Sequence, residues 1–230
     1  MRDDPHKKLV LFDIDGTLIS AGGAGTRSMN LAFQGLFGIK DAFKDISMAG
    51  KTDPQIMKEG LKLHGFSHMD GNVESMKKMY LQFLHSEINN PFRKLKPGIQ
   101  DVLNVLHKRD MPLGLLTGNL EKGAEIKLTP FGIYDFFLDG AFGSDDEDRD
   151  MLLPIAIEKF KQKGFHIAPK DCIVVGDTPR DVQCARIHQA HCIAVATGPY
   201  SREDLLNTDA DIVLDSLTET EKCIDFILRC

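Results

Sequence analysis

Two acidic side chains follow an apolar run near the start of the chain. Residues 8–12 have the length and composition of a buried strand, and Asp13, Asp15 and Gly16 come directly after it. Alternate residues of a strand point to the same side, so the two carboxylates begin on one side of the chain. Two like charges held this close repel each other unless a cation or a shared proton compensates them. The spacing predicts a cation-binding or acid–base site, with a solvated acidic turn as the alternative.

Two later apolar runs, at 112–116 and 172–175, also end in polar residues. They are followed by Thr117, Gly118 and Asn119 and by Gly176, Asp177 and Asp181. If these strands are parallel, their carboxyl ends lie at one edge of a sheet, where open α/β proteins bind their ligands. We therefore expect the polar side chains of all three strand ends to converge on one site.

The periodicity of the apolar residues predicts the elements that position this site. Strands are expected at 8–12, 112–116, 172–175, 192–196 and 212–214, and helices at 24–37, 53–65, 71–88, 97–108, 120–128, 150–162, 180–188 and 217–228. In the second of these helices, Asp53 is the expected N-cap and Pro54 the first helical residue. Strands that alternate with helices indicate an α/β fold, a doubly wound parallel sheet covered on both faces.

The segment 18–93 differs from the rest of the chain, because it has helical patterns and no convincing strand. The first strand belongs with the later strands, so this segment is expected to be an insertion. We predict an α/β core of residues 1–17 and 94–230 and an α-helical cap domain of residues 18–93. The insertion carries a net charge of +2 in a chain of net charge −6, which would suit an anionic substrate bound above an acidic site.

Composition excludes several classes of function. A net charge of −6 disfavours nucleic acid as a partner, and no apolar run is long enough to span a membrane. The charged residues at the beginning of the chain argue against a signal peptide. The five cysteines are an odd number without a C-x-x-C pair, which favours free thiols in a reducing, cytoplasmic environment. A monomer and a homodimer are both compatible with the sequence.

The polar strand ends resemble the phosphatase branch of the haloacid dehalogenase superfamily. The matching residues are Asp13-Ile14-Asp15-Gly16-Thr17, Thr117, Arg149 and Gly176-Asp177-Thr178-Pro179-Arg180-Asp181. The resemblance covers nearly the whole chain, since the helical insertion is similar to the small cap of that family. It departs from the family at one position, where a Lys is usual and this chain has Arg149. Lys127 is the competing candidate for the phosphate-neutralising cation, and we favour Arg149.

The resemblance implies a role for each of these residues. Asp13 would attack phosphorus and form an aspartyl-phosphate, and Asp15 would act as the general acid and base. Phosphoryl oxygens would be bound by Thr17, Thr117, Gly118, Asn119 and Lys127, and Lys51 in the 49–53 loop would contact the anionic end of the substrate. Mg²⁺ is the expected cofactor because the donors are oxygens. Its implied ligands are Asp13, the backbone carbonyl of Asp15, and Asp177, with Asp181 as a supplementary or outer ligand.

The implied activity is a Mg²⁺-dependent phosphoric monoester hydrolase that acts on a small phosphorylated metabolite, such as phosphoglycolate or a sugar phosphate. A phosphomutase similar to β-phosphoglucomutase is the alternative, because sequence does not separate transfer to water from transfer to a sugar. Receiver domains also combine acids, Thr and Mg²⁺ on a doubly wound sheet, but they have about half this length. A metal-binding protein without activity is disfavoured by the complete set of acids.

Overall fold

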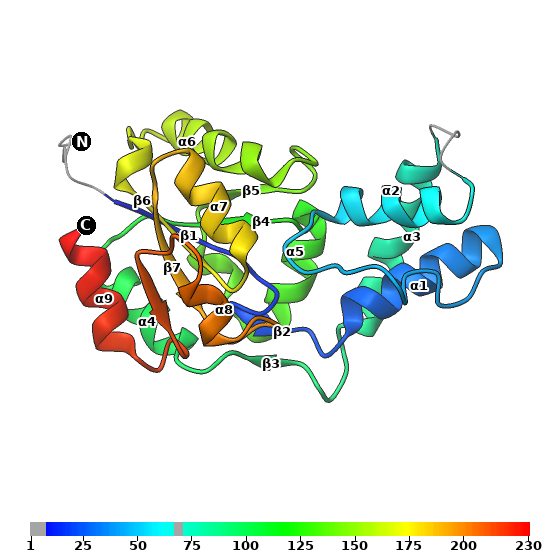
Figure 1. The fold of residues 1–230 in the computed structure, drawn as a ribbon, viewed down its shortest axis with the longest axis horizontal. Coiled ribbons are helices and arrows are strands. Elements are labelled where there is room, and N and C mark those ends of the chain that lie inside the picture. The colour runs from blue at the N-terminus through cyan, green and yellow to red at the C-terminus, as the bar shows by residue number, and fades with distance from the viewer. Residues whose placement is uncertain (1–7, 67–70) are drawn as a thin grey trace.

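The computed structural model describes residues 8–66 and 71–230, and the core of this part of the chain is a six-stranded parallel sheet (Figure 1). Its strands follow the spatial order β5-β4-β1-β6-β7-β8. They are β1 (Leu9–Phe12), β4 (Leu113–Thr117), β5 (Asp139–Phe142), β6 (Cys172–Gly176), β7 (His191–Val195) and β8 (Ile212–Leu214). All neighbouring strands run parallel, which confirms the predicted doubly wound α/β fold.

Helices cover both faces of the sheet, as the alternation of side chains along β1 requires. Leu9 and Leu11 belong to one apolar cluster, which includes residues of α6 (Leu152–Gln162) and α7 (Pro179–Ile187). Val10 and Phe12 belong to a second cluster, on the face covered by α4 (Ile99–His107), α5 (Glu121–Leu128) and α9 (Thr220–Arg229). The short helix α8 (Arg202–Leu206) lies between β7 and β8 in the chain. Because all four residues of β1 are buried, this strand is a rigid base for the acidic residues that follow it.

Three of the helices between β1 and β4 form a separate group beside the sheet (Figure 1). They are α1 (Ala24–Phe37), α2 (Asp53–Leu63) and α3 (Gly71–Glu87). We call residues 21–93 the helical unit. Two connections link it to the α/β unit, and they pair as the antiparallel strands β2 (Ile19–Ser20) and β3 (Lys94–Leu95). No convincing strand was predicted in residues 18–93, and so β2 was missed, because two residues are too few to show a periodicity.

The predicted elements agree with the structure except at a few places. Strand β5 was not predicted, because it is short and contains Gly140, where a Cβ would meet the Leu115 carbonyl oxygen at 2.5 Å. Helix α8 was also missed, although Ser201 and Asp204 form a capping box that could have indicated it. The last helix begins at 220 rather than 217. None of the helices in the described residues is both long and apolar enough to cross a membrane.

Candidate active site

The predicted site residues meet at the carboxyl edge of the sheet, beneath the helical unit. Strands β4, β1 and β6 are neighbours, so the three polar strand ends lie side by side. A cavity of about 550 Å³ opens there between the two units. Among its lining residues are Asp13, Asp15, Lys51, Thr117, Gly118, Asn119, Lys127, Arg149 and Asp177. Two predicted residues, Thr17 and Asp181, do not line the cavity and are buried behind it.

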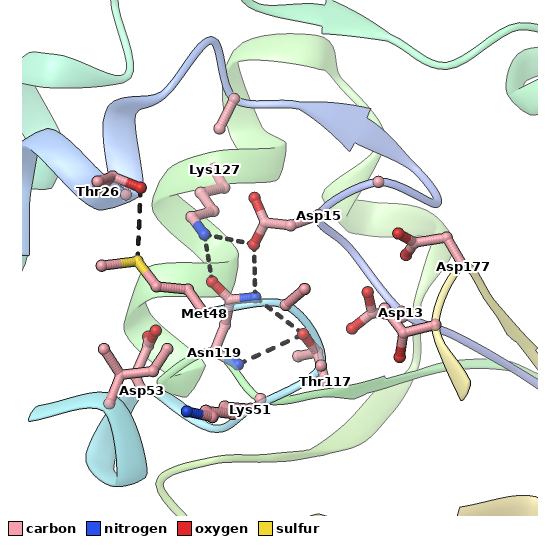
Figure 2. A pocket seen from close by; sticks show the side chains of 18 of the residues that line it. Asp13, Asp15, Thr26, Met48, Lys51, Asp53, Thr117, Asn119, Lys127 and Asp177 are labelled. Carbon is pink, nitrogen blue, oxygen red and sulfur yellow. Dashed lines mark hydrogen bonds and ion pairs between the residues drawn. The ribbon is translucent and has the colours of Figure 1, made fainter. Parts of the chain in front are cut away.

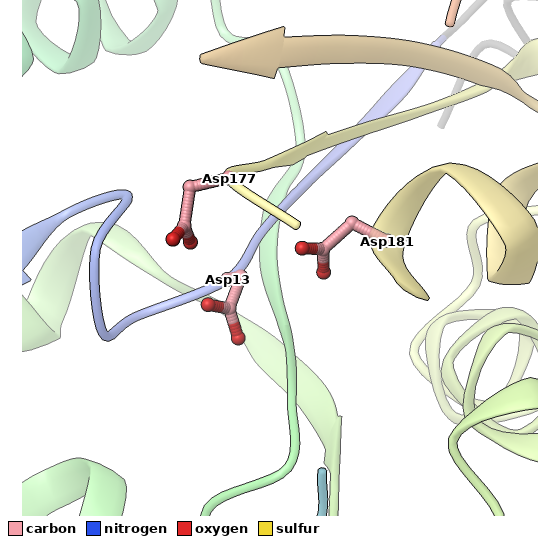
Figure 3. Close-up of side chains that lie close together, drawn as sticks. All are labelled: Asp13, Asp177 and Asp181. Atoms are coloured by element: carbon pink, nitrogen blue, oxygen red, sulfur yellow. The ribbon is translucent and has the colours of Figure 1, made fainter. Parts of the chain in front are cut away.

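Three carboxylates form a buried cluster on one side of this cavity (Figure 3). Asp13, Asp177 and Asp181 each offer an oxygen, and these oxygens lie within 4.8 Å of one another. Burial raises the pKa of Asp13 to about 6, although the Arg149 guanidinium partly opposes this effect. Burial, with the nearby charges of Asp13 and Asp181, raises the pKa of Asp177 well above its ordinary range. Three buried carboxyl groups this close together can all be ionised only if Arg149 and a further cation compensate their charge.

Asp177 has the features expected of a metal ligand. Its Oδ1 accepts a hydrogen bond of 2.9 Å from the Thr17 hydroxyl, whereas its buried Oδ2 has no partner among residues 8–66 and 71–230. Gly16 and Gly198 keep the space beside Oδ2 open, because a Cβ there would approach that oxygen to 2.2 Å and 1.6 Å. An unpartnered buried carboxylate oxygen next to Asp13 fits a hard divalent cation that prefers oxygen ligands.

Asp181 was predicted as a supplementary or an outer metal ligand, and in the structure both of its oxygens accept hydrogen bonds. Oδ1 accepts a hydrogen bond from Arg149, and Oδ2 accepts hydrogen bonds of 2.9 Å and 2.8 Å from the Thr178 amide and hydroxyl. The bond from the Thr178 amide is part of the capping box that begins α7. These contacts favour a role for Asp181 in holding Arg149 and the start of α7, outside the set of direct ligands.

Arg149, one of the two candidate phosphate-neutralising cations, lies beside Asp13. It belongs to a short 3₁₀ turn before α6, and its Nη2 donates to Asp13 Oδ1 at 3.1 Å and also to Asp181. Burial opposes its charge, but the two carboxylates hold the pKa of Arg149 above its ordinary value. Arg149 therefore stays charged and places a fixed cation next to the predicted nucleophile.

Lys127, the other candidate, lies beside Asp15 (Figure 2). Its Nζ is 2.5 Å from Asp15 Oδ2 and donates a second hydrogen bond to Asn119 Oδ1. Burial opposes its charge, yet Asp15 and Asp53 raise the pKa of Lys127. The Asn119 side-chain amide donates to Asp15 Oδ2 and to Thr117 Oγ1, each at 2.9 Å. Lys127 and Asn119 thus hold the carboxylate of Asp15 in place, whereas Arg149 forms an ion pair with Asp13.

Two residues predicted to bind substrate have other contacts in the structure. The Thr17 side chain is 1% exposed and its hydroxyl is bound to Asp177, so it orients a carboxylate instead of meeting a ligand. Lys51 does line the cavity, but its Nζ forms an ion pair of 2.5 Å with Glu59 of α2. A substrate anion would have to compete with Glu59 for this lysine.

Asp53, Tyr80 and Lys96 also line the cavity. None of them was predicted as a site residue, although Asp53 belongs to the 49–53 loop that was predicted to face the substrate. Asp53 was predicted to be the N-cap of α2, but the structure has Thr52 in that place, with its hydroxyl accepting the Gln55 amide. Tyr80 is fully buried within an apolar helical pattern, so its hydroxyl was the one available signal. Lys96 donates to the Thr197 carbonyl, a contact that no local pattern could reveal.

Comparison with known proteins agrees with this geometry. Residues 7–188 match the family model described as haloacid dehalogenase-like hydrolase. The chain is 23% identical over 217 residues to a phosphoglycolate phosphatase of Vibrio vulnificus, covering 92% of this chain and 93% of that protein. It is 26% identical over 221 residues to one of Chromobacterium violaceum, covering 93% and 95%.

Solved structures share the fold. CbbY from Rhodobacter sphaeroides, solved in complex with phosphate, superposes with a TM-score of 0.74 at 18% identity, covering 93% of this chain and 96% of that one. The family match spans most of the chain, and the resemblance seen in the sequence is confirmed. The chain belongs to the haloacid dehalogenase-like hydrolase family and is a phosphatase of that family.

Proposed function

We propose that this phosphatase hydrolyses the phosphate monoester of a small metabolite through a covalent phosphoryl group on Asp13. The observation that carries the proposal is the pairing of Asp13 with Asp177 at the edge of the cavity, where Asp177 has an unpartnered oxygen and Asp13 is held by Arg149. A nucleophile, a cation site and a fixed positive charge are the parts that phosphoryl transfer needs.

Asp13 and Asp15 divide the chemistry between them. An oxygen of Asp13 attacks phosphorus, the bond from phosphorus to the ester oxygen breaks, and Asp15 gives its proton to the departing oxygen. Asp15 then takes a proton from water, which attacks phosphorus and releases Asp13. Lys127 and Asn119 hold Asp15 in place for both steps.

The remaining polar groups at the strand ends would bind the phosphoryl oxygens. Thr117 lines the cavity, and the amides of Gly118 and Asn119 follow it directly in the chain. Arg149 would neutralise part of the phosphoryl charge from its place beside Asp13. Two anionic charges on the phosphate would repel Asp13 by roughly 8 kcal/mol at ~4 Å in an effective dielectric constant of about 20, so positive charge is essential.

A divalent cation, Mg²⁺ by the chemistry of the donors, fits the acidic cluster. Asp13, the backbone carbonyl of Asp15, and Asp177 would hold it, while Asp181 supports Arg149. When bound, this ion supplies the charge neutralisation that lets a carboxylate approach a phosphate dianion. Thr17 would keep Asp177 turned toward the ion.

The helical unit, together with residues 18–20 that connect it to the sheet, would act as a cap that closes over the α/β unit of residues 1–17 and 94–230. Its 49–53 loop contacts the carboxyl end of β4, since the Asp53 amide donates to the Gly118 carbonyl at 2.7 Å. A closed cap keeps bulk water from the phosphorylated enzyme. All five cysteines are free in the structure, which supports a cytoplasmic location. The enzyme would act as a monomer or a homodimer.

The relatives named phosphoglycolate phosphatase make phosphoglycolate the first substrate to test, with small sugar phosphates next. Initial rates of phosphate release should be measured over a panel of phosphorylated metabolites, with Mg²⁺ and with EDTA. Asp177→Asn is the matched variant, because it keeps the shape of the side chain and removes its charge. The proposal predicts release that needs both Mg²⁺ and Asp177, and release unaffected by EDTA would overturn it.

A further inference from the structure

Asp53 is a buried carboxylate that the proposed mechanism does not use. It opens helix α2 of the helical unit, yet its side chain is only 7% exposed and points away from that helix to the α/β unit. Burial raises the pKa of Asp53 to about 6, while Lys127 and the Leu120 amide oppose this effect. A buried carboxylate needs hydrogen-bond partners, and the partners of Asp53 indicate its role.

The backbone and the side chain of Asp53 both bind the loop after β4. The Asp53 amide donates to the Gly118 carbonyl at 2.7 Å, and Asp53 Oδ2 accepts the Leu120 amide at 2.9 Å. This loop lies close against the backbone of Lys51. A Cβ on Gly118 would be only 2.2 Å from the Lys51 carbonyl oxygen, so there is no room for a side chain. Both hydrogen bonds therefore cross from the helical unit to the α/β unit at the floor of the cavity.

Leu120 is the N-cap residue of α5, and a leucine side chain cannot accept a hydrogen bond. The first amides of a helix need acceptors from outside the helix. Asp53, which belongs to the helical unit, supplies the acceptor for the Leu120 amide, so it caps the start of α5 in the α/β unit. Its negative charge also suits the positive end of the helix dipole.

The last turn of α5 carries Lys127, the lysine that contacts the predicted general acid. Lys127 reaches Asp15, and its charge is also favoured by Asp53. Tyr80 of α3 also acts on Asp53 from the helical unit, since its hydroxyl lowers the pKa of Asp53 and the Asp53 charge raises that of Tyr80. Figure 2 shows Asp53 and Lys127 on the same side of the cavity as Asn119.

We propose that Asp53 is a positioning residue that holds the helical unit on the α/β unit by capping α5. We call its hydrogen bonds to Leu120 and Gly118 the clasp. The clasp favours the closed arrangement in which the charge of Asp53 acts on Lys127, the lysine that contacts Asp15. Replacing an N-cap residue by Ala costs an amount that changes an equilibrium by roughly 5- to 30-fold, so the closed state should lose about this factor without the carboxylate. The kinetic consequence rests on the proposed function, but the closure itself does not.

Hydrogen exchange tests the clasp without any assay of activity. In Asp53→Ala, the peptide that contains the Leu120 amide should exchange about tenfold faster, while peptides from β1 and β6 should exchange at the wild-type rate. Asp53→Asn should stay within about threefold of wild type, because Asn is as good an N-cap as Asp. Unchanged exchange in Asp53→Ala would overturn the proposal.

Kinetics then test the positioning role, with substrate from the panel above. Asp53→Ala should raise KM by roughly 5- to 30-fold and change kcat by less than about threefold, because substrate binding must now also close the cap. Asp53→Asn should restore KM. Glu147→Gln is the matched control, since Glu147 pairs with Lys58 across the same two units but is exposed.

The outcomes separate the two proposals. Fast exchange at Leu120 in Asp53→Ala, from an enzyme that hydrolyses no phosphate ester, would refute the proposed function and leave the clasp intact. A loss of kcat with unchanged KM, or an Asp53→Asn variant as impaired as Asp53→Ala, would refute the clasp. An equal rise in KM for Glu147→Gln would assign the effect to general charge and overturn the specific role of Asp53.

Discussion

Replacing Asp13 by Asn should abolish turnover and, in the metal-free protein, increase stability at neutral pH. The two effects have one cause, because Asp13 is held in a place that disfavours its charge until a cation arrives. Asn keeps the shape of the side chain but can neither attack phosphorus nor ionise. A loss of activity together with a gain in stability identifies a catalytic group that destabilises the fold.

The pKa shift of Asp13 sets the size of the effect. Burial raises this pKa from 3.8 to about 6 in the folded protein. The unfolded chain releases the proton first, so stability is highest below the unfolded pKa and falls as the pH rises through about 6. About two pKa units correspond to about 3 kcal/mol, of which about 2 kcal/mol lie between pH 4 and pH 7.5.

Urea unfolding in EDTA, at several pH values from about 4 to about 7.5, measures this difference. The free energy of unfolding of Asp13→Asn, relative to wild type, should increase by about 2 kcal/mol across that range. Asp204→Asn is the control, because hydrogen bonds from Ser201 lower the pKa of Asp204, so its effect on stability changes only below the ordinary pKa of Asp. Its stability relative to wild type should therefore change little between about pH 5 and about pH 7.5.

Two results would refute the reasoning. A stability difference between Asp13→Asn and wild type that does not change with pH would show that Asp13 is not a strained carboxylate. Phosphate release by Asp13→Asn at the wild-type rate, with the fold intact by circular dichroism, would remove its role as nucleophile.

Other changes to the acidic cluster have expected outcomes of their own. Arg149→Met leaves the buried Asp13 carboxylate without its cation, and urea unfolding should show a loss of about 3–5 kcal/mol, whereas wild-type stability would contradict the pairing. Gly198→Ala places a Cβ 1.6 Å from Asp177 Oδ2, so Mg²⁺ should no longer raise the melting temperature. Gly71→Ala, with open space around the new Cβ, is its control and should keep the Mg²⁺ effect.

The position of the acidic residues was predictable because it depends on local pattern and one topological rule. An apolar run before Asp13 indicates a strand, and parallel strands place their carboxyl ends together. The structure has β4, β1 and β6 as neighbours, so the three polar strand ends meet as expected. The helical unit was predictable for the same reason, since its helices are long enough to show their periodicity.

The partners of the charged residues were not predictable, because they depend on contacts between distant segments. Arg149 and Lys127 were weighed as alternatives for one position, whereas the structure gives each a carboxylate of its own. Asp53 has the sequence context of an N-cap, and its contact with Leu120 joins residues 67 positions apart. Local patterns record which face of a helix is apolar, and they carry no information on which charge another segment will bring.

The covalent role of Asp13 is tested most directly by trapping the phosphorylated enzyme. The protein should be quenched with acid during turnover of a substrate from the panel, reduced with borohydride, and digested for mass spectrometry. Reduction converts an aspartyl-phosphate to homoserine, so we predict this change at Asp13 in wild type and its absence in samples without substrate. A Mg²⁺-dependent enzyme that shows the adduct at another residue, or at none while turnover proceeds, would contradict the mechanism.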